Sequence, residues 1–256
     1  MKAVILAGGR GTRLMEETRI VPKPMVTIGE EPILLHIIRS LSKQGIKEFI
    51  VCLGYKGNLI KDYFINFHKM KSDLKIDLLS GKIETQTKDN LLDVNITLVD
   101  TGLNTNTAGR INRIKPYVKN ERFLLTYGDG VSDIEISEII HIHEKNGAIL
   151  TNANKQISSR FGSMKLNGNK VLNFTEKSEN AMRVNIGYFI CESEVFDFID
   201  NDADNVQWEN GPVVKIANSG KMFSYEHKGF WQCMDSLRDK EVLENLWKNN
   251  PLWKKW

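Results

Sequence analysis

The chain has 256 residues, of which 41% are hydrophobic and 26% charged, and its formal net charge is +3. This length is enough for a sizeable core, and we expect one domain. The small, scattered charge argues against nucleic acid as a partner, and no apolar run approaches the ~20 residues that cross a membrane. Cys52, Cys191 and Cys233 are widely spaced and form no CxxC pair. We therefore expect reduced thiols and a cytoplasmic location.

An apolar run at residues 2–6 predicts a strand buried on both faces, and a glycine-rich loop at residues 7–13 follows it. Glycine at positions 8, 9 and 11 lets the backbone approach a ligand and aim successive N–H groups at an anion. The loop has no Walker A lysine, and Leu14 stands where a dinucleotide fingerprint needs its third glycine. The alternative for the loop alone is a glycine-rich turn that binds nothing, which is the less favoured interpretation. Two cations favour a phosphate site: Arg13, and Lys23 held between Pro22 and Pro24.

The rest of the first half alternates between strand and helix patterns. We expect helices at residues 32–45, from about 57 to 67 and up to about 118, and strands at residues 49–53, 94–100 and 123–127. This alternation predicts a Rossmann-like, doubly wound α/β fold with a mixed, mostly parallel central sheet. The polar segment 70–95 interrupts the pattern, and we expect loops and a short hairpin there.

The second half is less regular and predicts small appended β elements. The expected strands are 148–152, a hairpin at 163–175, and 183–191; the expected helices are 136–145, 193–199, 211–219 and 237–248. No linker divides the chain. We expect a nucleotide-binding part (about 1–130), an acceptor-binding part (about 131–240), and a C-terminal helix with a Trp-rich tail (237–256).

Two aspartates stand where ligands bind in open α/β sheets. Asp129 lies in a Gly-Asp-Gly turn after a buried strand, at the carboxyl edge where the glycine loop also lies. Asp235 precedes the last helix, where a helix cap is as natural an interpretation as a metal ligand. Paired aspartates are typical anchors for Mg²⁺ bound to triphosphate oxygens. Lys177, at a predicted strand end, would alone be interpreted as a solvated lysine.

Taken together, these motifs resemble the sugar-phosphate nucleotidyltransferases, and most closely their glucose-1-phosphate cytidylyltransferase branch. The resemblance covers nearly the whole chain. It rests on KAVILAGGRGTRLMEET, PKPM, GYKG, ITLVDTG, TAGR, TYGDG, RFG, an EK pair, an Asn before a glycine, and GFWQCMDSLRD near the end.

The resemblance implies roles for individual residues. Those implied to bind the nucleotide are Leu6, Ala7, Gly8, Gly9, Arg10, Gly11, Thr12, Arg13, Lys23, Thr105, Gly109, Arg110 and Asp129. Those implied to bind the acceptor are Tyr127, Gly128, Arg160, Glu176, Lys177 and Asn185. Asp129 and Asp235 would bind Mg²⁺, and the implied catalytic residues are Arg13, Lys23, Asp129, Lys177 and Asp235.

Departures from the branch concentrate among acceptor residues. The branch commonly has lysine at Val21, glycine at Ile186 and glutamate at Gly211, and it has prolines where residues 155–159 stand. We expect these changes to lie at or beside the sugar site and to weaken or alter acceptor recognition.

The resemblance thus implies an Mg²⁺-dependent enzyme of nucleotide-sugar and polysaccharide biosynthesis. It would transfer CMP from CTP to glucose 1-phosphate, giving CDP-glucose and pyrophosphate. One alternative is the same reaction on another phosphorylated acceptor, and a second is a non-catalytic module that binds nucleotide or sugar phosphate. A dinucleotide-dependent oxidoreductase is disfavoured by the incomplete fingerprint. The resembled enzymes are oligomers, and we expect a homo-oligomer whose contacts use segment 70–95 or the Trp-rich tail.

Overall fold

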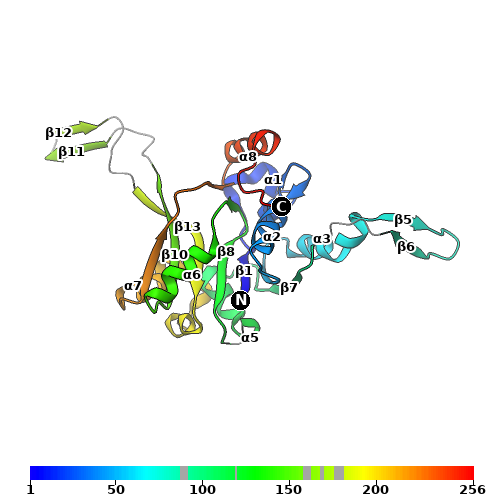
Figure 1. Cartoon of the computed structure of the whole chain (residues 1–256), viewed down its shortest axis with the longest axis horizontal. Helices are drawn as coiled ribbons and strands as arrows, with labels where there is room; N and C mark the ends of the chain where they lie inside the picture. Colours follow the sequence, from blue (N-terminus) through cyan, green and yellow to red (C-terminus); the bar gives the residue numbers. More distant parts are fainter. Residues whose placement is uncertain (87–91, 119, 158–162, 168–169, 176–181) are drawn as a thin grey trace.

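A seven-stranded sheet, ordered β14-β10-β13-β8-β1-β4-β7, forms the centre of the protein (Figure 1). The computed structural model describes residues 1–86, 92–118, 120–157, 163–167, 170–175 and 182–256. In this order the sheet strands are Met222–Glu226, Leu150–Ile157, Met182–Cys191, Phe123–Tyr127, Lys2–Leu6, Glu48–Leu53 and Asn95–Asp100. Only β13 runs antiparallel to its two neighbours. The predicted mixed, mostly parallel α/β sheet is confirmed.

The sheet is buried on both faces, which explains its apolar strands. In β1, Ala3 and Ile5 pack into one core cluster, whereas Val4 and Leu6 pack into the other. Successive side chains of a strand point to opposite faces, so a strand covered on both sides needs a continuous apolar run. The first cluster includes residues of α2 (Ile33–Lys43), α3 (Gly57–Met70), α6 (Ile136–Lys145) and α8 (Leu237–Asn249). The second includes residues of α4 (Thr107–Arg113), α5 (Lys115–Val118) and α7 (Val214–Asn218).

Several short elements complete the chain. They are α1 (Met15–Thr18), the β2–β3 pair (Thr27–Ile28, Glu31–Pro32) and the β9–β15 pair (Gly130–Ser132, Trp231–Cys233). A 3₁₀ helix at Ser193–Phe198 agrees with the predicted helix there. The helix predicted at 211–219 corresponds to α7, Val214–Asn218, which a π-helical turn at Glu209–Val213 precedes. Strand β14 was not predicted, because its sequence MFSYE is short and half-exposed and lacks clear alternation.

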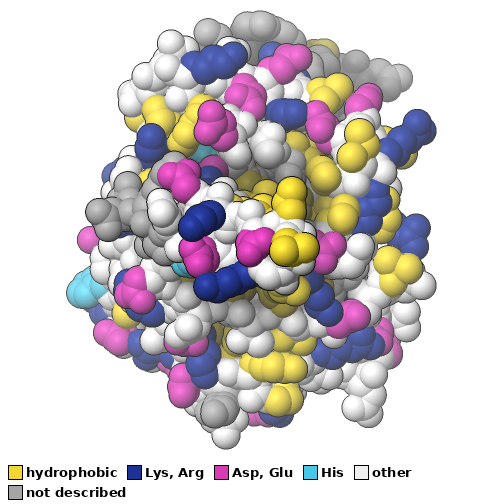
Figure 2. Space-filling view, turned by 90° about the vertical axis from the view of Figure 1, so that its right-hand side faces the viewer, with side chains coloured by type: hydrophobic (Ala, Val, Ile, Leu, Met, Phe, Trp, Pro, Cys, Tyr) yellow, Lys and Arg dark blue, Asp and Glu magenta, His cyan; other side chains and the backbone are white. Residues whose placement is uncertain are grey.

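Two hairpins extend away from the sheet (Figure 1). One is β5–β6 (Asp73–Ile76, Ile83–Gln86), which confirms the predicted hairpin in segment 70–95. The other is β11–β12 (Ser163–Asn167, Lys170–Thr175), as predicted. At the turn of β5–β6, Leu78 and Leu79 are 91% and 99% exposed. Figure 2 shows hydrophobic side chains among charged ones on the side from which this hairpin extends.

The C-terminal tail packs on α2 through its tryptophans. Trp253 is fully buried, and its indole Nε1 donates to His36 Nδ1 at 3.4 Å, while His36 Nε2 lies 2.9 Å from the Ile28 carbonyl oxygen. Trp247 meets the same imidazole edge-on, with ring centroids 4.8 Å apart. The tail is therefore part of the core. Among the described residues, no helix is long and apolar enough to span a membrane.

Candidate active site

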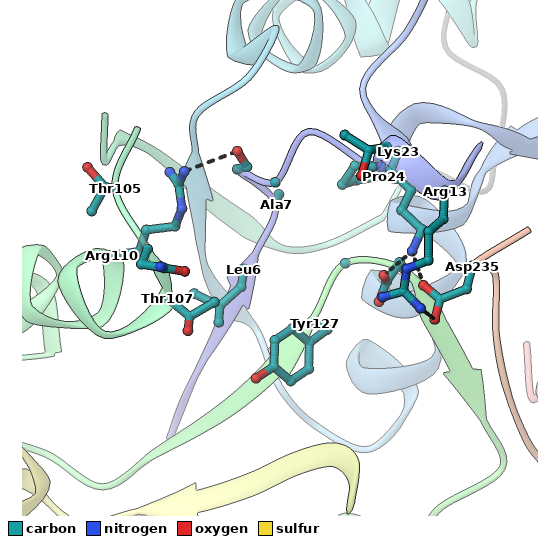
Figure 3. Close-up of a pocket in the computed structure, with 17 residues that line it drawn as sticks. Leu6, Ala7, Arg13, Lys23, Pro24, Thr105, Thr107, Arg110, Tyr127 and Asp235 are labelled. Atoms are coloured by element: carbon teal, nitrogen blue, oxygen red, sulfur yellow. Dashed lines mark hydrogen bonds and ion pairs between the residues drawn. The ribbon is translucent and has the colours of Figure 1, made fainter. Parts of the chain in front are cut away.

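A cavity of about 290 Å³ lies at the carboxyl ends of β1 and β8 (Figure 3). This is the edge where open α/β sheets bind ligands. Most residues implied to hold the nucleotide line this cavity: Leu6, Ala7, Gly8, Gly9, Gly11, Thr12, Arg13, Lys23, Thr105, Arg110 and Asp129. Pro24, Asn106 and Thr107 also line it and were not predicted. Arg10 is not among the lining residues, and its guanidinium donates to Asn104 Oδ1 at 3.1 Å.

At one end of the cavity, Lys23 joins the two aspartates. Its Nζ lies 2.6 Å from Asp129 Oδ2 and 2.5 Å from Asp235 Oδ1. Arg13 Nη1 donates to the other oxygen of Asp235 at 2.9 Å, although the Arg13 side chain is 78% exposed. Residues more than 100 positions apart in sequence therefore form one charged cluster (Figure 3).

The contacts within the cluster favour the charged forms of Lys23 and Asp235. Burial lowers the pKa of Lys23, but the charges and hydrogen bonds of Asp129 and Asp235 outweigh it, so that the pKa is raised overall. Burial acts to raise the pKa of Asp235, and Lys23 and Arg13 reverse this, so that its pKa lies below the usual value. Two basic and two acidic side chains thus lie next to the glycine-rich loop.

Asp129 and Asp235, the two residues implied to bind Mg²⁺, lie close together. Both contact a single ammonium, so both reach one point where a cation can lie. Mg²⁺ is often held by one or two carboxylates, with phosphate oxygens and water as its other ligands. The described residues include no group of three or more His, Cys, Asp or Glu side chains that could hold a metal ion. Asp235 does not cap α8, because Ser236 and Asp239 form that capping box.

At the other end of the cavity, Arg110 holds the backbone together. It is 4% exposed, and its guanidinium donates to the carbonyl oxygens of Leu53, Gly102 and Gly8 and to Thr101 Oγ1, at 2.8–3.1 Å. These bonds join the ends of β4 and β7 to the glycine loop. A Cβ at Gly8 would lie 2.2 Å from Arg110 Nη1, which explains glycine at this position. The implied role of Arg110 at the nucleotide stays a prediction.

Gly109 is absent from the cavity wall, contrary to what its implied contact with nucleotide would suggest. A Cβ at this position would lie 2.3 Å from Asp204 Oδ1. The residue therefore lets α4 pack closely against the segment that contains Asp204. Glycine here serves helix packing.

A second cavity, of about 370 Å³, adjoins the first and shares part of its wall. Arg13, Tyr127, Asp129 and Asp235 line both cavities. Of the residues implied to bind the acceptor, Asn185 lines only the second cavity, whereas Gly128 lines only the first. Two ligands bound in these cavities would meet at the charged cluster.

Not all of the residues that depart from the branch pattern line the second cavity, where the sequence predicted the sugar site. Ile186 does line the second cavity, although it is 3% exposed and belongs to the first core cluster. Val21 packs against that same cluster and is absent from the walls of both cavities. Gly211 is also absent from both, and a Cβ there would lie 2.5 Å from Val206 Cγ1. Gly211 thus lies beside the second cavity, two residues from Glu209, and not on its wall.

Glu209, two positions earlier, lines the second cavity and accepts a hydrogen bond from the Tyr127 hydroxyl. Sequence reasoning missed Glu209 because a π-helical turn decides which residue of this segment faces the cavity. Arg160, Glu176 and Lys177 lie outside the described residues, and their roles stay predictions. All three cysteines are free, and Cys233 lines the second cavity.

Comparisons with known proteins agree with this architecture. A family described as "Nucleotidyl transferase" matches residues 2–232. The chain is 46% identical over 259 residues to the glucose-1-phosphate cytidylyltransferase of Salmonella typhimurium, with both chains covered completely. It is 37% identical over 257 residues to a probable glucose-1-phosphate cytidylyltransferase of Bacillus subtilis, again with complete coverage of both.

Two solved structures share the fold at low sequence identity. A putative glucose-1-phosphate thymidylyltransferase from Bacillus anthracis has a TM-score of 0.71 at 17% identity, covering 97% of this chain and 96% of its own. The inositol-1-phosphate CTP transferase from T. maritima has a TM-score of 0.66 at 16% identity, covering 99% and 96%. The matched family, the full-length relatives and the shared fold lead to one conclusion: this chain belongs to the nucleotidyl transferase family and is a nucleotidyltransferase.

Proposed function

We propose that the enzyme transfers CMP from CTP to glucose 1-phosphate, with CDP-glucose and pyrophosphate as products. One observation of the site carries the proposal: two adjoining cavities share a wall that contains Arg13, Asp129 and Asp235. This arrangement suits two phosphorylated substrates whose phosphates meet between them. The full-length relatives named glucose-1-phosphate cytidylyltransferase support CTP and glucose 1-phosphate as the pair.

The reaction is an in-line attack by an acceptor phosphate oxygen on the α-phosphorus of CTP, so it needs positioning and charge neutralisation but no protein nucleophile. The glycine loop would orient the triphosphate with its backbone N–H groups. Arg13 and Lys23 would neutralise charge on phosphate oxygens. Tyr127, between the two cavities, would separate the nucleotide from the sugar.

The proposal includes Mg²⁺, held by Asp129 and Asp235, as the ion that neutralises the triphosphate. Each aspartate already contacts the Lys23 ammonium, which supports a cation site at this point. When the ion is bound, Lys23 would be free to contact phosphate oxygens. Stimulation by Mg²⁺ and its loss in EDTA would test this part.

The decisive experiment measures pyrophosphate release from each nucleoside triphosphate with a panel of sugar 1-phosphates and other phosphorylated acceptors. Chromatography and mass spectrometry would identify the product. We expect CDP-glucose from CTP and glucose 1-phosphate. Turnover of a different acceptor would favour the first alternative. Tight binding of both ligands without pyrophosphate release, with or without Mg²⁺, would favour a non-catalytic module.

The proposal also includes assembly into a homo-oligomer in the cytoplasm. Isolated two-stranded hairpins are marginally stable in water, and the β5–β6 hairpin exposes Leu78 and Leu79 at its turn. A second copy of the chain would bury this apolar end. Light scattering should show a smaller assembly for Leu78→Ser/Leu79→Ser than for wild type, with Val214→Ser, an exposed residue of α7, as the control. An unchanged mass would exclude this contact.

A further inference from the structure

The wall of the second cavity holds a carboxylate that the assigned roles do not use. Glu209 is half-buried, and its described side-chain hydrogen bond comes from the Tyr127 hydroxyl. Burial raises the pKa of Glu209, and no cation contributes to the shift. Within the described part of the chain, no basic side chain forms an ion pair with it. Glu209 therefore differs from Asp129 and Asp235, which contact Lys23.

The position of Glu209 is built into the fold. The preceding residue, Trp208, is fully buried and meets Phe189 of β13 edge-on, with ring centroids 6.3 Å apart. The Trp208 backbone N–H donates to Thr107 Oγ1 at 2.7 Å, and its carbonyl accepts from Val213 N at 3.0 Å. The second bond closes a π-type turn. Single π turns often occur at functional sites.

Tyr127, the hydrogen-bond partner of Glu209, is also held in place, by residues of β13. Gly187, with φ of +81°, lies beneath the ring, and a Cβ there would come within 2.6 Å of Tyr127 Cδ2. Asn185 accepts a hydrogen bond from the Gly187 backbone N–H at 3.0 Å. The Tyr127 hydroxyl is thereby directed to Glu209, and the carboxylate is held at the cavity wall.

We infer that Glu209, positioned by Tyr127, binds hydroxyl groups of the acceptor and sets specificity for its carbohydrate end. The inference rests on the proposed function and deepens it. A carboxylate accepts hydrogen bonds from hydroxyls and repels phosphate, whereas Arg13, on the wall shared with the first cavity, attracts phosphate. The acceptor is thereby oriented with its phosphate toward the charged cluster and its hydroxyls toward Glu209.

The placement of Glu209 also bears on the glutamate that is missing at Gly211. The carboxylate that the sequence lacks at Gly211 is supplied to the cavity by Glu209, while a side chain at Gly211 would meet Val206. Glu209 is thus the carboxylate available for sugar hydroxyls on this part of the described wall. A glutamate at Gly211 would not restore one.

The test is the affinity for glucose 1-phosphate of Glu209→Gln, measured calorimetrically with the non-hydrolysable α,β-methylene analogue of CTP present. We expect Kd and KM for glucose 1-phosphate to rise about 10- to 100-fold, and KM for CTP to change less than about twofold. The matched control is Glu194→Gln, an exposed glutamate on a neighbouring segment, which should bind as wild type.

Deoxy analogues locate the contact. Wild type should bind the deoxy analogue that lacks the contacted hydroxyl about as weakly as Glu209→Gln binds glucose 1-phosphate. Combining that analogue with the variant should add little further loss, because both changes remove the same interaction. Additive losses for every deoxy analogue would overturn the inference.

A second variant keeps the inference testable if Glu209→Gln does not fold. Tyr127→Phe keeps the carboxylate but removes the hydroxyl that positions it, and we expect Kd for glucose 1-phosphate to rise about 3- to 10-fold. A Kd within about twofold of wild type in Glu209→Gln, or in Tyr127→Phe if Glu209→Gln does not fold, would overturn the inference. Failure of the proposed function is distinguishable, because wild type would then release no pyrophosphate with any acceptor.

Discussion

The ammonium of Lys23 lies 2.6 Å from the carboxylate of Asp129, and in the same position it also contacts Asp235. The cation expected at the phosphates and the carboxylates expected at the metal are thus ion-pair partners. The Lys23 side chain is 11% exposed, so this is a largely desolvated interaction. The enzyme is therefore expected to exchange partners within this cluster when substrates bind.

Asp129→Asn and Asp235→Asn should each lower kcat by about a thousandfold, because each removes a charge that would anchor the proposed Mg²⁺. Each variant leaves Lys23 paired with the remaining aspartate, so the melting temperature should change little. Rates at saturating Mg²⁺ and thermal unfolding would be measured for both variants. A near-wild-type rate would show that the substituted residue is not a metal ligand.

Lys23→Ala should lower kcat more than it raises KM for CTP, because charge on the leaving pyrophosphate develops in the transition state. It should also leave two carboxylates facing each other without their shared counter-charge. We therefore expect Mg²⁺ to raise the melting temperature of Lys23→Ala more than that of wild type. An unchanged kcat with a raised KM for CTP would contradict the catalytic role.

Gly8→Ala should destabilise the protein by about 2 kcal/mol or more, because its Cβ would displace the Arg110 guanidinium from buried oxygen acceptors. Gly9→Ala is the matched control. A Cβ at Gly9 meets nothing within 4 Å, so its effect should stay within about 0.5 kcal/mol. Urea unfolding would compare the two variants. Equal losses would show that the contact with Arg110 is unimportant.

Stability should fall as the pH drops below about 6.5, the ordinary pKa of histidine. Burial lowers the pKa of His36 in the folded state, so below pH 6.5 the unfolded chain binds a proton that the native protein does not. The loss is at most about 1.4 kcal/mol per pH unit for each such group. His143, whose pKa is also lowered by burial, contributes with the same sign.

Urea unfolding at pH 5.5 and 7.5 would measure this dependence. His36→Gln should weaken it, whereas His141→Gln, at an exposed position, should preserve it. The same dependence in His36→Gln as in wild type would mean that the lowered pKa of His36 does not contribute.

The local sequence was sufficient for the framework of the fold. Apolar strands such as residues 2–6 and 49–53 are continuous because both faces of the sheet are covered, and this pattern identifies them without tertiary information. The positions of Asp129 and of the glycine loop followed as well, since both come directly after such strands. Most residues that line the first cavity were predicted from the resemblance to the family's motifs.

Other features depend on contacts between residues far apart in the chain. The pairing of Lys23 with Asp235 joins positions 212 apart, and the four bonds of Arg110 gather three chain segments. The sequence could place these cations near phosphates but could not reveal their partners in the folded protein.

The limit of prediction from sequence is clearest on the acceptor side of the site. Sequence spacing pointed to Gly211, whereas a π-helical turn anchored by buried Trp208 brings Glu209 to the cavity. A helical turn with one extra residue changes which side chains share a face, and nothing in the local residue pattern announces it. The sequence therefore determined the family, the sheet and the nucleotide loop. Only tertiary packing decided which carboxylate lines the second cavity and which charged side chains pair with each other.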